Sequence, residues 1–375
     1  METEKKINEL IINITNCIHK NYPELVEYLD EMPITLPDQK HPELTVKSLT
    51  SYYNSLVNVV EEYEENHKEN VMCERFEKLS TEEFTEFDKQ KSHQDIYINI
   101  NDFKISYNDV GEGTVPIIFL HGFPFDKSMW NGQLESLKAN NRVIAVDIRG
   151  FGKSEDENTH LSMELFTEDL LLFMEELNIE RAVLCGLSMG GFVALDAIKR
   201  FPEHFDALIL CDTQCIADTS EVKEKRYAAI DEINRNGAGA FNDKFVKSVF
   251  HTETLTNKPG LVDELRAVVN ANSDRIIKAG LVALADRSET CSILEDITVP
   301  TLIICGRQDG VTPLAQSEAM HKSIQNSELR IIDNAGHVSN LESPVEFNSY
   351  INEFLTTLSD SQTVVPNSEP LSPKI

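Results

Sequence analysis

The residues best suited to chemistry in this chain are a serine, an aspartate and a histidine, in that order along the sequence. Ser188 lies in the segment Gly186-Leu187-Ser188-Met189-Gly190, which fits the pattern Gly-x-Ser-x-Gly. An apolar run precedes the segment and an apolar helical pattern follows it, so Ser188 is predicted on a tight turn between a strand and a helix. The free N–H groups at the start of that helix would favour an oxyanion beside the serine.

A serine hydroxyl must lose its proton as it attacks, so a base has to lie within hydrogen-bond reach. His337 is the candidate base, because it follows a short predicted strand that ends at Ile332 and a loop of small residues. The other histidines lack this setting. We expect the others to be surface residues, with the exception of His121.

An imidazole base needs a carboxylate that fixes its tautomer and stabilises its charge. Asp309 follows the predicted strand 301–305, and Thr312-Pro313 then opens a helix with a capping hydroxyl and a proline. Asp212, at the end of an earlier strand, is the rival acid. We favour Asp309, since strand, acidic loop and capped helix form one consistent unit.

Two backbone donors are expected to form the oxyanion hole. The turn itself presents the N–H of Met189. The loop His121-Gly122-Phe123-Pro124, directly after the strand that ends at Leu120, is expected to supply the N–H of Phe123.

The elements that must position these residues alternate between strands and helices. Residues 96–100 and 103–107 alternate apolar and polar residues around Asn101-Asp102, which predicts a hairpin. Continuous apolar runs, typical of strands buried on both faces, follow at 115–120, 143–146, 182–184, 207–210 and 301–304. Amphipathic helices separate most of them, so the fold class is α/β with a parallel sheet.

One interval lacks strands and is predicted to be a helical cap, at about 213–298. Helical patterns occur near 221–235, 239–250, 259–271 and 273–286, and an insertion of this length is more than a connecting loop. Apolar residues that could line its inner face are Phe241, Phe245, Val249, Phe250, Leu261 and Leu265. Apolar residues at helical spacing serve packing more often than a pocket.

Residues 1–92 differ from the rest and predict a small helical module that ends in an acidic linker. Apolar residues recur at helical spacing between Ile7 and Ile18 and between Leu49 and Tyr63, with a shorter candidate helix at 23–31. The linker is expected near 66–92. Residues 93–358 would form the α/β domain, and the Ser- and Pro-rich residues 359–375 a disordered tail.

Composition limits the partners and the compartment. A net charge of -29 repels phosphate backbones and anionic lipids, so neither nucleic acid nor a membrane surface is an expected partner. The seven cysteines are odd in number and irregularly spaced, and we expect reduced, mostly buried thiols. The N-terminus lacks the apolar core of a signal peptide and no run is long enough to span a membrane, so the prediction is cytoplasmic.

Taken together, these motifs closely resemble the α/β-hydrolase family over roughly residues 95–358. The segments that carry the resemblance are His121-Gly122-Phe123-Pro124, Asp147 to Ser154, Gly186 to Gly191, Gly306 to Asp309 and Gly336-His337. Within the family the chain looks most similar to the 3-oxoadipate enol-lactonase, carboxylesterase and cofactor-free haloperoxidase group. The resemblance implies an eight-stranded, mostly parallel sheet with a helical cap over the serine. Related dehalogenases and epoxide hydrolases carry an aspartate at the nucleophile position, so Ser188 argues against those activities.

The sequence therefore predicts a serine hydrolase that cleaves a small-molecule carboxylic ester or lactone through an acyl-enzyme. Ser188, His337 and Asp309 would form the triad, and no metal or organic cofactor is expected. Carbon–carbon bond hydrolysis and perhydrolysis would use the same residues and stay open. So does a sensor with little turnover that reports through the N-terminal helices, which could also serve homo-oligomer formation or a protein partner.

Overall fold

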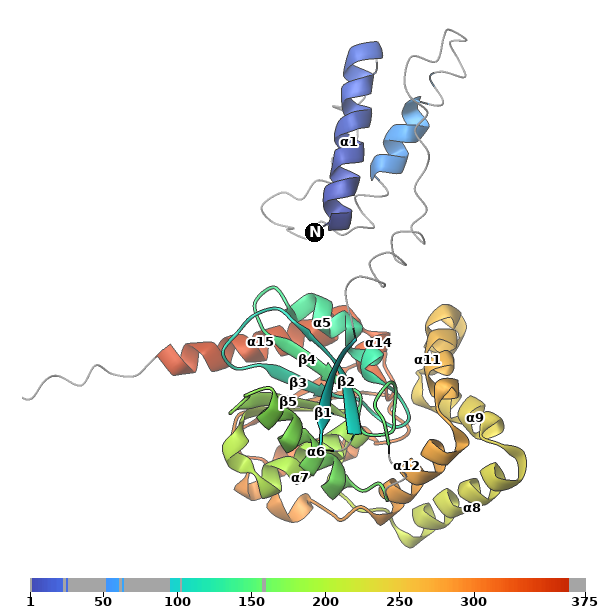
Figure 1. The fold of residues 1–375 in the computed structure, drawn as a ribbon, viewed down its shortest axis with the longest axis vertical. Coiled ribbons are helices and arrows are strands. Elements are labelled where there is room, and N and C mark those ends of the chain that lie inside the picture. The colour runs from blue at the N-terminus through green and yellow to red at the C-terminus, as the bar shows by residue number, and fades with distance from the viewer. Residues whose placement is uncertain are drawn as a thin grey trace, which may run out of the picture. The chain divides into compact units, whose positions relative to one another are not determined.

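The structure is a computed structural model that describes residues 2–22, 25, 52–60, 63, 95–101, 103–156 and 160–363. The chain divides into two compact units, Met1–Gln94 and Asp95–Ile375 (Figure 1). The expected helix at 23–31, except for Leu25, and the expected linker at 66–92 lie outside the described residues. Residues 364–375 of the expected tail lie outside them as well.

The first unit has a hydrophobic core of its own. Helix α1 (Glu2–Asn21) buries Ile7, Ile14 and Ile18 completely, and these residues follow the helical spacing of the sequence. A second helical stretch over 52–60 contributes Leu56 and Val57 to the same cluster. These two helices therefore bury their apolar faces on each other.

The second unit is built on one eight-stranded sheet with the order β1-β2-β4-β3-β5-β6-β7-β8. Strands β1 and β2 form the expected hairpin, β2 pairs antiparallel with β4, and the remaining neighbours are parallel. The mostly parallel sheet is thus confirmed. The strands are β1 (Ile96–Ile100), β2 (Phe103–Val110), β3 (Ile117–Leu120), β4 (Val143–Val146), β5 (Ala182–Leu187), β6 (Phe205–Cys211), β7 (Thr301–Gly306) and β8 (Ser327–Ile332).

Helices cover both faces of this sheet. Alternate residues of β3 point to opposite sides: Ile118 belongs to the cluster with α6 and α7, whereas Phe119 belongs to the cluster with α5 and α15. This explains the continuous apolar runs in the sequence, because both faces are buried. The helices outside the cap are α5 (Asn131–Leu137), α6 (Met163–Glu176), α7 (Met189–Arg200), α13 (Leu314–Ser323), α14 (Ser339–Glu342) and α15 (Pro344–Thr363), with 3-10 turns η2 (Lys127–Trp130), η3 (Pro202–His204) and η4 (Cys291–Asp296). Helix α15 extends to Thr363 and thus into the segment expected to be disordered.

The interval between β6 and β7 is helical, as predicted, and its helices lie together at one side of the unit (Figure 1). They are α8 (Ser220–Asn236), α9 (Gly239–Val249), α10 (Thr252–Asn257), α11 (Pro259–Ala271) and α12 (Asp274–Asp286). Side chains cap two of them at the N-terminus: Thr219 accepts from Val222 N–H, and Ser273 accepts from Ile276 N–H. We call this segment the cap.

The cysteine prediction was wrong in part. Cys215 and Cys291 form a disulfide with an S–S distance of 1.99 Å, and Cys17 is disulfide-bonded as well. Cys215 follows β6 and Cys291 precedes β7, and these two strands are neighbours in the sheet, so the ends of the cap meet although they are 76 residues apart. Cys185, Cys211 and Cys305 are free and buried, as expected. Structural disulfides persist in oxidising compartments. The cysteines therefore no longer argue for a cytoplasmic location, which stays a prediction.

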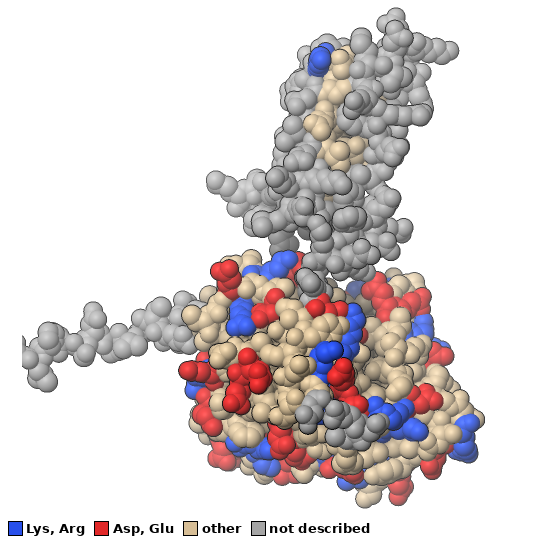
Figure 2. Space-filling view, viewed as in Figure 1, with Lys and Arg blue, Asp and Glu red and all other residues tan. Residues whose placement is uncertain are grey.

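The surface of the second unit mixes both signs of charge. On the face shown in Figure 2, acidic and basic side chains are interspersed among the described residues and do not form a single basic area. Among the helices that the structure describes, none combines the length and apolar character needed to cross a bilayer.

Candidate active site

Ser188 lies at the turn between β5 and α7, in a backbone conformation that few residues adopt. Its φ of 54° and ψ of -113° fall outside the usual regions for a residue with a side chain. The turn is this tight because glycines flank it: a Cβ on Gly186 would lie 2.2 Å from the carbonyl oxygen of Gly190. Hydrogen bonds hold the serine backbone, from Ser188 N–H to Cys211 O at 3.0 Å and from Thr213 Oγ1 to Ser188 O at 2.9 Å.

The structure brings Ser188, His337 and Asp309 into one hydrogen-bonded chain. The Oγ of Ser188 lies 2.8 Å from Nε2 of His337, and Nδ1 of His337 lies 2.8 Å from Oδ2 of Asp309. All three residues are buried, with exposed fractions of 8%, 1% and 5% in that order. A carboxylate can only accept, so Nδ1–H donates to Asp309, and Nε2 is left free to accept from the serine hydroxyl.

Asp309 is held by the loop that follows β7. Its Oδ1 accepts from the N–H groups of Val311 and Thr312, and its Oδ2 accepts from the Thr312 hydroxyl at 2.7 Å. Burial raises the pKa of this carboxyl, but the charge of His337 and the hydrogen bonds outweigh it and hold the pKa below its usual value. Asp309 is therefore an ionised partner for His337.

The loop that carries His337 is fixed by its backbone. His337 N–H donates to Val249 O at 2.7 Å, and Gly336 N–H donates to Oε1 of Glu342 at 2.6 Å. Burial alone would lower the pKa of His337, but the charge and hydrogen bond of Asp309, together with the charge of Glu342, raise it above its usual value. The imidazole thus lies in a negative environment that stabilises its protonated form.

The rival acid, Asp212, has different partners. Its Oδ1 accepts from Gly306 N–H at 2.8 Å, and its Oδ2 accepts from the Ser339 hydroxyl at 2.5 Å. Burial and the charge of Asp309 raise the pKa of Asp212 to about 8, so this carboxyl is mainly protonated at neutral pH. Asp212 thus connects the end of β7 with the start of α14, directly after the loop of His337.

Asp212, Cys305 and Asp309 also form a set whose potential metal-ligand atoms lie within 4.8 Å of one another. The oxygens of both aspartates already accept hydrogen bonds from this chain. Burial raises the pKa of the Cys305 thiol, so the thiolate that a metal would need is disfavoured. We assign the set to the positioning of the loops.

The loop after β3 lies against the serine. A Cβ on Gly122 would lie 3.2 Å from the Cβ of Ser188, so the backbone approaches closely there. His121 holds the loop in place, since its Nδ1 lies 2.8 Å from Gly122 O and its Nε2 accepts from Ile148 N–H. Neither the backbone N–H of Phe123 nor that of Met189 donates a hydrogen bond to another described residue, although both residues are buried.

Aromatic side chains of the loop and of the cap meet next to this point. The ring of Phe123 contacts Phe245 of α9 and Phe151, with centroids 5.9 and 6.0 Å apart, and Phe245 stacks on Phe241. Of the apolar cap residues named from the sequence, Val249, Phe250 and Leu265 belong to the buried core, and Leu261 packs against it. Phe241 and Phe245 are partly buried and pack against the core as well, so packing is the observed environment of all six.

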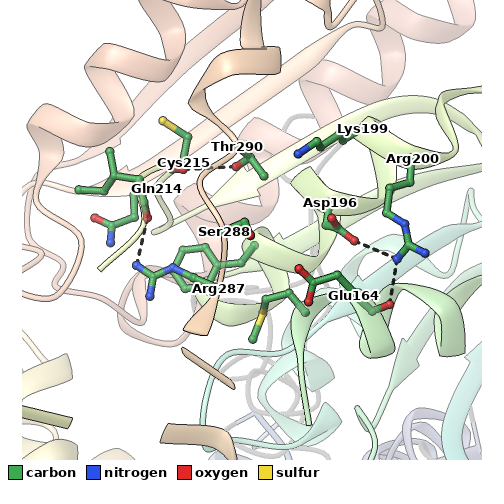
Figure 3. A pocket seen from close by; sticks show the side chains of 12 residues that line it. Glu164, Asp196, Lys199, Arg200, Gln214, Cys215, Arg287, Ser288 and Thr290 are labelled. Atoms are coloured by element: carbon green, nitrogen blue, oxygen red, sulfur yellow. Dashed lines mark hydrogen bonds and ion pairs between the residues drawn. The ribbon is translucent and has the colours of Figure 1, made fainter. Parts of the chain in front are cut away.

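A separate cavity of about 220 Å³ lies where the ends of the cap join α6 and α7 (Figure 3). Two of its cationic side chains are in ion pairs: Arg200 pairs with Asp196, and the buried Arg287 pairs with Asp218. Its lining does not include Ser188, Asp309 or His337. We assign this cavity to the junction of cap and core.

Several residues that support the site could not be predicted from the sequence. Thr213 donates to the backbone of the serine turn, Glu342 accepts from the histidine loop, and Ser339 donates to Asp212. Each is a single polar residue without periodic spacing, so only the three-dimensional contact reveals its role.

The fold and this arrangement define an α/β hydrolase. The family model described as "alpha/beta hydrolase fold" matches residues 115–344, and the chain belongs to that family.

Individual relatives agree with this assignment. 3-oxoadipate enol-lactonase 1 of Acinetobacter baylyi is 32% identical over 256 residues, which cover 66% of this chain and 91% of the relative. The solved structure of a thermophilic esterase from Thermogutta terrifontis is 30% identical, with a TM-score of 0.67 over 71% of this chain and 99% of that one. The enol-lactonase from Burkholderia xenovorans LB400 is 27% identical, with a TM-score of 0.65 over 70% of this chain and 100% of that one.

Proposed function

We propose that this protein is a serine hydrolase that cleaves carboxylic esters or lactones through an acyl-enzyme. The observation that carries the proposal is the buried hydrogen-bonded chain from Ser188 through His337 to Asp309, with both distances at 2.8 Å. Asp309, whose pKa lies below its usual value, is the ionised carboxylate that the triad requires. The enol-lactonases and the esterase among the similar proteins support this substrate class.

In the proposed reaction, the Oγ of Ser188 attacks the carbonyl carbon of the ester while its proton passes to Nε2 of His337. The carbonyl oxygen becomes an oxyanion that the N–H groups of Phe123 and Met189 would stabilise. The intermediate then collapses to the acyl-enzyme, and the departing alkoxide takes the proton from Nε2. Water repeats the sequence on the acyl-enzyme and releases the acid.

Asp309 would act through His337 and not on the substrate. Its carboxylate accepts from Nδ1–H and so keeps Nε2 unprotonated toward Ser188. The Thr312 hydrogen bonds keep the carboxylate in that orientation. The pair stabilises the imidazolium that forms during the attack.

The substrate is proposed to be a small molecule whose acyl group is neutral or apolar. The aromatic rings of Phe123, Phe245 and Phe241 meet beside the loop that would hold the oxyanion. Apolar surface there favours an apolar acyl group by burial. The strongly negative chain as a whole is a poor match for nucleic acid.

The test is turnover of a panel of p-nitrophenyl esters and aliphatic lactones by the wild type and by Ser188→Ala. We expect the wild type to hydrolyse part of the panel and the variant to lose at least about 10³-fold in kcat. Ser349→Ala, on the surface of α15, is the matched control and should match the wild type. Equal turnover in Ser188→Ala would refute the proposal, and adding hydrogen peroxide to the same panel detects perhydrolysis.

A further inference from the structure

We propose that the cap positions the oxyanion loop, with Asn272 and Gly280 as the positioning residues. This inference rests on the proposed function and gives the cap a part in the reaction. Asn272 ends α11, and Gly280 lies in the middle of α12. Both meet Phe123-Pro124 directly, far from them in the sequence.

Asn272 binds the backbone of the loop. Its Nδ2 donates to the carbonyl oxygen of Pro124 at 2.8 Å. The same nitrogen lies 3.3 Å from the carbonyl oxygens of Val268 and Val269 in the last turn of α11. The side chain therefore joins the end of a cap helix to the residue that follows Phe123.

Gly280 lets α12 approach the ring of Phe123. A Cβ at this position would lie 2.5 Å from Cε2 and 2.8 Å from Cδ2 of Phe123, and 3.0 Å from Cζ of Phe151. The ring has little room to yield, because Phe245 and Phe151 flank it in edge-on contacts. Any side chain at 280 must therefore displace Phe123 or the helix.

Helix α12 also contacts the core loops at other points, and these contacts hold the helix in position. Arg275 forms an ion pair with Asp156. Ile276 packs against the backbone of Gly150, where an added Cβ would lie 2.7 Å from Cδ1 of Ile276. On the core side, His121 already holds the same loop. The Phe123 amide is thus fixed between the core and the cap.

This geometry has a catalytic consequence because the Phe123 ring and N–H share one Cα. A donor contributes fully only when it points at the position that the oxyanion occupies. Displacement by about 1 Å can cost roughly 10²-fold in rate. Cap residues that never touch the substrate should therefore change kcat more than KM.

The test compares Gly280→Ala and Asn272→Ala with the wild type on an ester that the wild type hydrolyses. We expect kcat to fall about tenfold in each variant, with KM within about threefold. Affinity for butylboronic acid, whose serine adduct mimics the tetrahedral intermediate, should fall in parallel with kcat/KM. Gly260→Ala is the matched control, since a Cβ in that cap helix would meet nothing within 4 Å, and its kcat should stay within about twofold.

A double variant asks whether Gly280 acts through the ring. In the Phe123→Leu background the amide donor remains but the flanked ring is gone, so Gly280→Ala should cost clearly less there. Asn272→Ala keeps the test open if Gly280→Ala fails to fold, as thermal denaturation would reveal. Unchanged kcat in folded variants, or a rise in KM alone, would overturn the inference. Failure of the proposed function differs from both, because the wild type itself would then show no turnover.

Discussion

At the scale of single residues, two buried aspartates compete for one role, that of the carboxylate that orients His337. Asp309 lies 2.8 Å from the imidazole, whereas Asp212 accepts from Gly306 N–H and the Ser339 hydroxyl. The two carboxyls also differ in charge: the pKa of Asp309 lies below its usual value and that of Asp212 is raised to about 8. Two acids close together are thus kept in opposite protonation states.

Asp309→Asn should reduce kcat by about 10³- to 10⁴-fold, because the amide favours the wrong tautomer of His337. Asp212→Asn is the matched control. It should lose less than about tenfold, since the amide resembles the protonated carboxyl and can still bond Gly306 and Ser339. Steady-state kinetics on one ester measures both. A larger loss in Asp212→Asn would reverse the assignment of the acid.

The pH profile should report His337. The base must be neutral to take the serine proton, so kcat/KM falls toward acid as His337 protonates. Because the surrounding carboxylates raise the pKa of His337, the midpoint of this limb should lie above 6.5, the ordinary histidine value. Glu342→Gln removes one of these charges and should shift the midpoint to lower pH. A limb below 6.5 in the wild type would contradict this reading of the site.

At the scale of elements, most of the second unit could be predicted from the sequence, because local signals determine it. The alternation in 96–100 and 103–107 gave the hairpin, and the apolar runs gave the buried parallel strands. The cap helices follow their helical spacing. The disulfide between Cys215 and Cys291 escaped prediction, because the spacing of cysteines does not reveal that the two cap ends meet.

The disulfide joins the ends of the cap, and Figure 3 displays Cys215 beside Thr290, whose hydroxyl lies 3.4 Å from the carbonyl oxygen of Cys215. Replacing both Cys215 and Cys291 by serine should reduce the free energy of unfolding by about 2–5 kcal/mol, because the open chain gains entropy. Denaturant unfolding measures the loss. The control is reduction with dithiothreitol, which should destabilise the wild type more than the double variant. Equal stability would show that the disulfide does not constrain the cap.

Contacts between distant segments account for the other supporting residues that the sequence did not reveal. Asn272 and Pro124 are separated by 148 positions, and Gly280 meets Phe123 across a similar interval. Nothing in the local sequence of α11 or α12 marks these positions. Motifs indicated the reacting residues, whereas the residues that hold them depend on how the cap packs.

At the scale of the whole molecule, two units each bury a core of their own. The first unit packs Ile7, Ile14 and Leu56 with one another, and the clusters of the second unit begin at Ile100. All the proposed reacting residues belong to the second unit. We therefore expect the reaction not to depend on the helical module.

Deleting residues 1–92 should leave ester turnover within about twofold of the full chain, because Asp95, which pairs with the buried Lys127, is retained. The comparison uses kcat and KM on the same ester, and size-exclusion chromatography of both chains reports any change in assembly. Loss of turnover from a folded truncated chain would assign the N-terminal helices a part in the reaction.

Covalent labelling with a fluorophosphonate, followed by mass spectrometry of the peptides, tests directly whether Ser188 is the nucleophile. We expect one modified residue, Ser188, with labelling abolished in Ser188→Ala and strongly slowed in His337→Ala, while Ser349→Ala labels like the wild type. Folded wild type that stays unlabelled, or a label on a serine other than Ser188, would show that Ser188 is not the nucleophile.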